Sequence, residues 1–341
     1  YEFGGDYAPY RFVPQGHLGC NFEYNPKTKC FHIQNIVRGE SAVEDHSSPL
    51  LQPGVQISEG DTLLSINAQD VSFQRTPEEL LFHQAGVEVS LRIGDAQGKK
   101  PRSVIIKTLK DDTACRYRNW VQKNREHVNK ITKGQVGYIH IPDMGPHGFA
   151  EFHRAYFIEV EKPALLIDVR FNGGGHVSQL LLEKLLRRRI GYGTQRWGQT
   201  EPYPLDSLLG PMIAITNEHA GSDGDIFSHS FKLMKLGKLI GKRTWGGVIG
   251  IWPRHSLVDG TVTTQPEFSF WFEDVEWGVE NYGTKPDIDV DITPQDYRNQ
   301  RDTQMEVALR EIQKLLKDNA PKVPKFAKRP SRKVPSLPKI S

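Results

Sequence analysis

A regular alternation of strand-like and helix-like segments between residues 136 and 316 constrains the fold of this 341-residue chain more than any other feature. Short apolar runs such as ALLIDVR (164–170) and MIAIT (212–216) have the length of buried strands. Longer segments with apolar residues at helical spacing, such as HVSQLLLEKLLRR, lie between them. Strands that alternate with helices are typical of an α/β domain with a mostly parallel sheet. We therefore predict such a domain over residues 111–316.

Residues 15–110 have a different pattern, with five short β-type runs and one helical segment, TPEELLFHQA. The runs are GHLGCNFEY, CFHIQNIV, DTLLSINAQDV, VEVSLRIG and RSVIIKTL, which together predict a compact barrel-like module. In QISEGDTLLSINAQDV a Gly-Asp turn feeds a strand that ends in an Asn turn, which is similar to a PDZ domain. Such domains bind an extended peptide as an added strand. The loop that binds the peptide carboxylate would then be Gly16, His17, Leu18 and Gly19, and the alternative is a plain small β-domain.

The two ends of the chain differ from both modules. We predict that residues 1–14 are a remnant of a preceding domain and that residues 317–341, rich in Pro and Lys, are disordered. The net charge of +3 is mild and gives no case for a nucleic-acid partner. No apolar run reaches the roughly 18 residues that a membrane span needs, so we expect no membrane association.

The three cysteines, Cys20, Cys30 and Cys115, are few and lack metal-ligand spacing. We interpret them as reduced thiols of a cytoplasmic protein, with a Cys20–Cys30 disulfide as the alternative. The sequence therefore predicts no metal site and no organic cofactor.

Ser222 lies in NEHAGSDGDIFS, where a predicted strand turns into a predicted helix. Such a turn directs free backbone N–H groups and the positive end of a helix dipole at the adjacent side chain, which suits a developing oxyanion. Ser222 is therefore a candidate nucleophile. The alternative is a helix N-cap, for which serine is also favoured, and this stretch alone does not decide between them.

Two further stretches carry candidate site residues. FNGGGHV (171–177) follows a strand and precedes a helix, so its N–H groups can hold an anion and its glycines let a substrate backbone approach. It lacks the Lys-Ser/Thr of a phosphate loop and the spacing of a dinucleotide fingerprint, which argues against nucleotide binding. Glu280, in GVENYG, can orient a histidine or its partner, although a single glutamate is more often a solvated side chain.

These motifs occur in a definite order after the PDZ-like module: GYIHIPDMG, DVRFNGGGHVSQL, NEHAGSDGDIFS, GKLIGKRTWGGVIGI, DGTVTTQPEFSFWF and GVENYGTKPDIDV. The series resembles the C-terminal part of the tricorn proteases, within the tail-specific protease family, from about residue 1 to about residue 316. The resemblance implies a ClpP/crotonase-type fold for the α/β domain. It also implies a cytoplasmic serine peptidase that cleaves oligopeptides through an acyl-enzyme, a homo-hexamer, and aminopeptidases as downstream partners.

The resemblance assigns roles to residues of the glycine and serine motifs. Ser222 matches the nucleophile, and the N–H of Asp223 matches one oxyanion donor. The other donor is the N–H of Gly175 or Gly174, and Gly173 lies in the same substrate-binding bend.

Glu280 matches the carboxylate that completes a catalytic tetrad through a second serine. In the family that serine precedes the general-base histidine in a motif of the type Ser-His-Ala-Tyr-Glu, and this chain begins at Tyr1. We therefore expect the base to lie upstream and this chain alone to be nearly inactive, because general-base assistance is typically worth about 10²–10⁴-fold. His219 and His176 are the nearest candidates for a substitute base, since His229 would lie about 10 Å away along a helix.

One departure from the family concerns specificity. After RRRIGY the tricorn pattern carries an aspartate that favours basic residues at the cleavage site, whereas this chain has Gly193 and Thr194. A trypsin-like preference is therefore not expected, and Asp223 and Glu218 are candidates for compensating charge.

Two other function classes stay open from the sequence. The first is a peptide-binding PDZ-type module without catalysis. The second is a crotonase-like acyl-CoA enzyme, which also pairs two N–H groups as an oxyanion hole. The Gly-Ser-Asp-Gly turn and the PDZ-like module argue against the second, since CoA chemistry needs neither.

Overall fold

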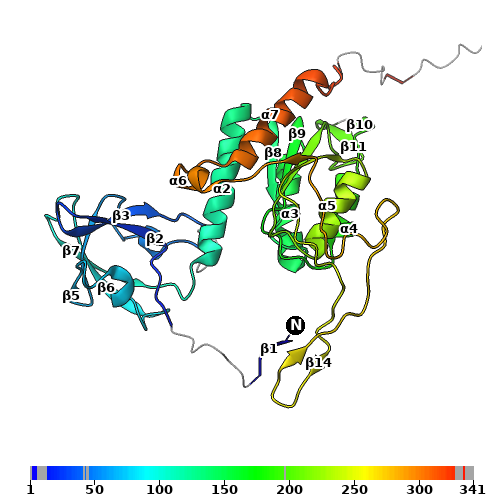
Figure 1. Cartoon of the computed structure of the whole chain (residues 1–341). Helices are drawn as coiled ribbons and strands as arrows, with labels where there is room; N and C mark the ends of the chain where they lie inside the picture. Colours follow the sequence, from blue (N-terminus) through cyan, green and yellow to red (C-terminus); the bar gives the residue numbers. More distant parts are fainter. Residues whose placement is uncertain are drawn as a thin grey trace, which may run out of the picture. The chain divides into compact units, whose positions relative to one another are not determined.

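The computed structural model describes residues 2–5, 14–40, 43, 46–195, 197–326 and 333–334. The chain forms two compact units, each with its own core (Figure 1). The first unit is Tyr1–His127 with Ile249–Ser269, and the second is Val128–Val248 with Phe270–Ser341. Most of the predicted remnant 1–14 and most of the predicted tail beyond residue 326 lie outside the described residues.

The first unit contains a mainly antiparallel β-module. Its elements are β2 (Cys20–Asn25), β3 (Cys30–Ile36), the 3₁₀-helix η1 (Pro49–Leu51), β4 (Thr62–Ile66), β5 (Gln69–Asp70), α1 (Pro77–Leu80), β6 (Glu88–Gly94) and β7 (Arg102–Lys107). The sheet order is β2-β3-β4-β6-β7, with β5 paired to β4. Along β6, Val89, Leu91 and Ile93 alternate with exposed residues and enter the core, as expected of a sheet with one buried face. The five predicted strands are therefore present.

The predicted helix TPEELLFHQA is much shorter than its sequence pattern. α1 starts at the N-cap Thr76, whose hydroxyl accepts a hydrogen bond from the Glu79 N–H, and ends at Leu80. His83 follows with a φ of 58°, a left-handed conformation that terminates helices.

The sequence SLVDGTVTTQPEFSFWF (256–272) also predicts strand structure, but most of this segment is irregular. This segment contributes only β15 (Val262–Thr263), and β14 (His255–Ser256) ends at its first residue. The two pair with each other, and β15 pairs with β1 (Glu2–Phe3) in a small antiparallel sheet. The Asp259–Gly260 turn between β14 and β15 breaks the run.

The second unit is built on a five-stranded parallel sheet, which confirms the predicted mixed α/β domain. Its strands are β8 (Val136–His140), β9 (Ala164–Asp168), β12 (Met212–Thr216), β13 (Gly237–Gly241) and β16 (Ile288–Asp289), in this order across the sheet. Every residue of β8, β9 and β12 is buried, as expected of strands covered on both faces.

Four helices of this unit cover the two faces of the sheet (Figure 1). They are α3 (Pro146–Glu159), α4 (Ser178–Leu185), α5 (Asp223–Leu233) and α7 (Thr303–Asp318). The short helix α6 (Pro294–Arg298) has no buried residue, and α2 (Thr113–Thr132) runs from the first unit into the second. Since neighbouring strands follow one another in sequence, right-handed crossovers bring α3, α4 and α5 to one face. There Phe152, Leu181 and Phe227 pack with Ile139 and Ile167, and α7 packs on β9, β12 and β13 from the other face.

One element of the second unit was missed in the sequence. β10 (Gly191–Thr194) and β11 (Thr200–Tyr203) form an antiparallel hairpin that holds the predicted specificity position Gly193 opposite Glu201. The hairpin has few buried residues, so it carries no clear hydrophobic periodicity.

The sheet brings the two candidate loops together. β9 and β12 are adjacent and parallel, with Leu165 opposite Met212. Because the carboxyl ends of parallel strands meet at one edge, the glycine bend after β9 and the Ser222 turn after β12 emerge side by side. This edge of the sheet is where we locate the candidate site.

Candidate active site

Ser222 is the residue between β12 and α5 that has an unusual backbone. Its φ is 55° and its ψ is −121°, a positive φ that is uncommon outside glycine and clusters at functional sites. Its side chain is half-buried and makes no capping hydrogen bond to the helix within the described chain. Ser222 therefore occupies the N-cap position of α5, but its hydroxyl does not cap the helix.

The glycine bend lies directly against Ser222. Gly174 has a φ of 83°, and a Cβ built there would come within 2.6 Å of Ser222 Cβ and 2.9 Å of the Gly221 carbonyl oxygen. A Cβ at Gly175 would lie 2.0 Å from the Met144 carbonyl oxygen. Both positions therefore require glycine, whereas a Cβ at Gly173 would meet nothing within 4 Å.

Asn172, which the sequence reasoning missed, holds this arrangement together. Its side chain is fully buried and donates to the Ile141 carbonyl at 2.8 Å, while its Oδ1 accepts from the Gly174 N–H at 2.9 Å. The Asn172 carbonyl accepts from the Gly221 N–H at 3.0 Å. One residue thus joins the glycine bend to the Ser222 turn. A polar residue directly before three glycines was the signal available in the sequence.

Two backbone N–H groups beside Ser222 lack an acceptor in the part of the chain that is described. One belongs to Asp223, the first residue of α5, where helix geometry provides no partner. The other belongs to Gly175, whose neighbours Gly174 and His176 instead donate to Asn172 and Met144. The two predicted donors Asp223 and Gly175 are therefore available to a ligand, and the Gly174 N–H is not.

The Asp223 carboxylate has a structural role. It is buried, and its two oxygens accept from the hydroxyl of Ser178 at 2.5 Å and from the Ser178 N–H at 3.0 Å. Because Ser178 begins α4, this contact joins the starts of α4 and α5. Asp223 therefore does not supply the compensating charge suggested for Gly193. Gly193 itself is exposed, and a Cβ there would meet nothing within 4 Å.

The loop 244–248 is hydrogen-bonded both to α5 and to Glu280. The Gly246 N–H donates to Asp225 Oδ1 at 2.8 Å, and the Val248 N–H donates to Glu280 Oε2 at 2.7 Å. Asp225 lies one helical turn after Ser222 and is fully buried. Burial, with a smaller contribution from the Glu280 charge, raises the pKa of Asp225 to about 6. Glu280 is thus linked to the Ser222 helix through one short loop.

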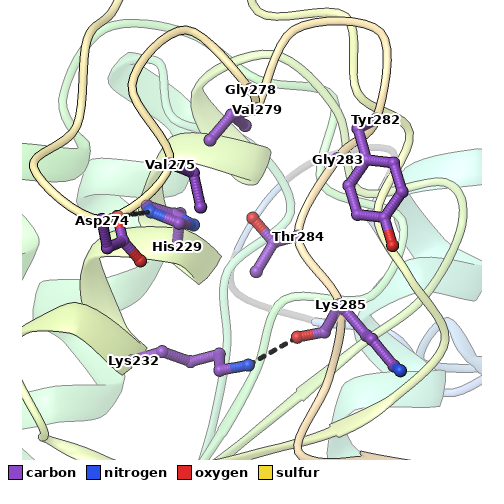
Figure 2. A pocket seen from close by; sticks show the side chains of 10 residues that line it. All are labelled: His229, Lys232, Asp274, Val275, Gly278, Val279, Tyr282, Gly283, Thr284 and Lys285. Carbon is purple, nitrogen blue, oxygen red and sulfur yellow. Dashed lines mark hydrogen bonds and ion pairs between the residues drawn. The ribbon is translucent and has the colours of Figure 1, made fainter.

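His229 does not act on Ser222. Its Nε2 lies 3.0 Å from Asp274 Oδ1, and the pair lines a cavity of about 180 Å³ between α5 and the segment 274–285 (Figure 2). Lys232 lies in the same cavity and donates to the Lys285 carbonyl (Figure 2).

The remaining candidate histidines are also not bonded to the nucleophile. His219 is exposed and stacks on Phe171, with ring centroids 5.5 Å apart, and His176 is exposed. His140 is buried near the Arg170 carbonyl, and burial lowers its pKa. Within the described residues, no histidine hydrogen-bonds to the Ser222 hydroxyl.

Two backbone N–H groups of the predicted carboxylate-binding loop 16–19 are hydrogen-bonded within the first unit. The Gly16 N–H donates to the Leu81 carbonyl at 2.9 Å, and the His17 N–H donates to the Leu109 carbonyl at 3.0 Å. These two groups are therefore occupied. Carboxylate binding by the loop 16–19 stays a prediction that would depend on the N–H groups of Leu18 and Gly19.

Among the described residues, no three histidine, cysteine, aspartate or glutamate side chains come together as metal ligands. No helix in the same part of the chain has both the length and the apolarity that a bilayer crossing needs.

Comparison with known proteins follows the same division of the chain. Residues 16–111 match the family model described as the tricorn protease PDZ domain, and residues 135–290 match peptidase family S41. The curated "Tricorn protease homolog" of Saccharolobus solfataricus is 50% identical over 310 residues, which are 91% of this chain and 28% of that protein. The "Tricorn protease" of Thermoplasma acidophilum is 45% identical over 309 residues, again 91% of this chain and 28% of that protein.

A solved structure shows the same similarity to the tricorn proteases as these sequence relatives. The crystal structure of the tricorn protease superposes with a TM-score of 0.86 at 44% identity, covering 93% of this chain and 31% of that chain. Residues 135–290 therefore belong to peptidase family S41, and they follow a segment that matches the tricorn PDZ domain. Within that family the chain is similar to the tricorn proteases, which confirms the resemblance drawn from its motifs. It spans about three tenths of the length of these relatives.

Proposed function

We propose that this chain supplies the PDZ domain and the nucleophile domain of a serine peptidase that cleaves oligopeptides through an acyl-enzyme on Ser222. The observation that carries the proposal is the Ser222 turn. Its strained serine has no capping hydrogen bond and lies beside two N–H donors, those of Asp223 and Gly175, that have no other acceptor in the described chain. The sequence similarity to tricorn proteases supports the same reaction class.

The reaction follows from this geometry. The Ser222 oxygen forms a bond to the scissile carbonyl carbon while its proton passes to a general base. The carbonyl oxygen becomes an oxyanion, and the N–H groups of Asp223 and Gly175 stabilise it. The C–N bond then breaks, and the base returns the proton to the leaving amine. Water hydrolyses the resulting ester in the same way.

We further propose that Glu280 orients the base through a serine, as the family resemblance implies. Its carboxylate is fixed by the Val248 N–H, on a loop that is itself bonded to the nucleophile helix. The motif of the type Ser-His-Ala-Tyr-Glu does not occur in the printed sequence. The base in this proposal is a histidine of that upstream motif, since His219, His140 and His229 have other partners.

The remaining features of the proposal come from the resemblance alone. They are a ClpP/crotonase-type arrangement of the α/β domain, a cytoplasmic location, a homo-hexamer, and aminopeptidases that take up the products. The parallel sheet with a nucleophile turn at its carboxyl edge is compatible with that arrangement. Size-exclusion chromatography with light scattering tests the hexamer directly.

The nucleophile is tested by labelling with a small fluorophosphonate, followed by peptide mapping. The proteins are this chain, a version extended upstream through the Ser-His motif, and the Ser222→Ala variant of the extended protein. We expect labelling at Ser222 in the extended protein only, and none in the variant. If Ser222 is unlabelled in every version, the nucleophile assignment is wrong and peptide binding by the PDZ domain becomes the better account.

A further inference from the structure

We propose that Trp245 forms the wall of a subsite that binds an apolar side chain of the substrate peptide next to the scissile bond. This inference rests on the proposed function, because it names a substrate contact of the same site. Trp245 follows β13, and its N–H donates to the Ala220 carbonyl at 2.9 Å, two residues before the nucleophile. The Trp245 backbone is therefore attached to the Ser222 turn.

The indole ring lies against two glycines. A Cβ built at Gly221, the residue before Ser222, would come within 2.8 Å of Trp245 Cε3. A Cβ at Gly247 would come within 2.3 Å of Cζ3 of the same ring. Contacts shorter than 3 Å exclude a side chain, so these two glycines are the residues that leave room for the ring. The ring is thus placed one residue from the nucleophile.

The loop that carries Trp245 is held by hydrogen bonds along its length. Besides the bond of Trp245, the N–H of Thr244 donates to the Thr284 carbonyl at 3.1 Å. The N–H groups of Gly246 and Val248 donate to the carboxylates of Asp225 and Glu280. These bonds hold the backbone that carries the ring in one position, which lowers the entropy lost when a substrate binds.

Despite this support, the side chain of Trp245 is 57% exposed. No aromatic ring or cation of the described chain packs against it, so its outer surface is open to a ligand. Exposed apolar area is unfavourable in water, and a rigid, exposed indole beside a reactive group is typical of a binding contact. The residues that follow it in the loop, Gly246, Gly247 and Val248, carry no charge. The family's acidic specificity position is Gly193 here. Both facts favour an apolar side chain over a basic one.

The test compares Trp245→Ala with the parent in the extended protein that carries the Ser-His motif. Two series of internally quenched peptides are used, one varied on the acyl side of the scissile bond and the other on the leaving-group side, each with Leu, Phe, Ser or Asp. We expect kcat/KM for the Leu and Phe peptides of one series to fall about 10-fold or more, because a lost apolar contact is worth about that factor. The Ser and Asp peptides and labelling by the small fluorophosphonate should be unchanged.

Two control variants make the result specific. Trp245→Phe keeps an aromatic surface and should retain most of the preference for Leu and Phe. Trp271→Ala removes an indole of similar exposure, 54%, from another segment and should change neither peptide series. If Trp245→Ala lowers all peptides and the small probe alike, the ring merely supports the Ser222 turn and the proposal is overturned. Unchanged discrimination in both series would overturn it as well. Failure of the proposed function is recognised separately, as absence of Ser222 labelling in the parent.

Discussion

At the scale of single residues, Gly174 is the position where the Ser222 turn tolerates change least. Its φ of 83° disfavours any side chain, and an added Cβ would be 2.6 Å from Ser222 Cβ. We predict that Gly174→Ala lowers the free energy of unfolding by about 1–3 kcal/mol and reduces Ser222 labelling in the extended protein by at least about 10-fold. Denaturant unfolding followed by tryptophan fluorescence, together with probe labelling, measures both effects.

Gly173 provides the matched control one residue earlier. It has no positive φ, and a Cβ there would meet nothing within 4 Å. Gly173→Ala should therefore leave stability within about 0.5 kcal/mol of the parent and should leave labelling intact. Equal effects of the two substitutions would show that the bend does not need its close approach to Ser222.

The same residues show what sequence reasoning could and could not reach. Glycines between a strand and a helix are visible as a pattern, so the bend and the Ser222 turn were predicted together. Asn172 and Asp225 were missed because their importance lies in partners distant in the sequence, such as the Ile141 carbonyl and the Gly246 N–H. A buried polar side chain carries no periodic signal of its own.

At the scale of elements, the strands and helices with strong periodicity were predicted, whereas the marginal ones were missed or were predicted with the wrong bounds. The five strands predicted from the β-type runs of the first module and the helices that pack on the parallel sheet are present. The hairpin β10–β11 and the two-residue strands β14 and β15 depend on pairing rather than on burial, so their sequences show little alternation.

The link between α5 and the loop 244–248 leads to a prediction about pH. The pKa of Asp225 is raised to about 6, so the folded protein binds this proton more tightly than the unfolded chain does. Stability from this group is therefore present at low pH and falls as the pH rises from about 4 to about 6. A change in pKa from the ordinary value of 3.8 to about 6 corresponds to roughly 3 kcal/mol. Asp225→Asn keeps an oxygen acceptor for the Gly246 N–H but does not titrate.

The measurement is the free energy of unfolding of both proteins between pH 4 and pH 7.5. We expect Asp225→Asn to gain stability relative to the parent across this range, with most of the gain reached by about pH 6.5. Carboxylates that do not interact with Asp225 titrate equally in both proteins, so the difference isolates Asp225 and its interaction with Glu280. A difference that does not change with pH would contradict the raised pKa.

At the scale of the whole molecule, the three cysteines report on the integrity of the fold, and all three are free thiols. Cys20 lies in the core of the first unit, and burial raises its pKa to about 12. Cys115, in α2, is fully buried, and burial raises its pKa to about 11. Cys30 is half-buried at the start of β3. The thiolate is the reactive species, so the two buried residues should be nearly inert at pH 8.

We predict that Ellman's reagent at pH 8 titrates one thiol rapidly in the folded protein and three after unfolding in guanidinium chloride. Cys30→Ser should abolish the rapid phase and leave two thiols detectable after unfolding, which identifies the reactive residue. Two or three rapid thiols in the native protein would mean that a core opens on the timescale of the reaction. A Cys20–Cys30 disulfide would give a different result. No thiol would then react rapidly, and unfolding would expose only one thiol unless a reductant was added. Because the two buried cysteines belong to α2 and to the β-module, their protection tests whether both are folded in solution.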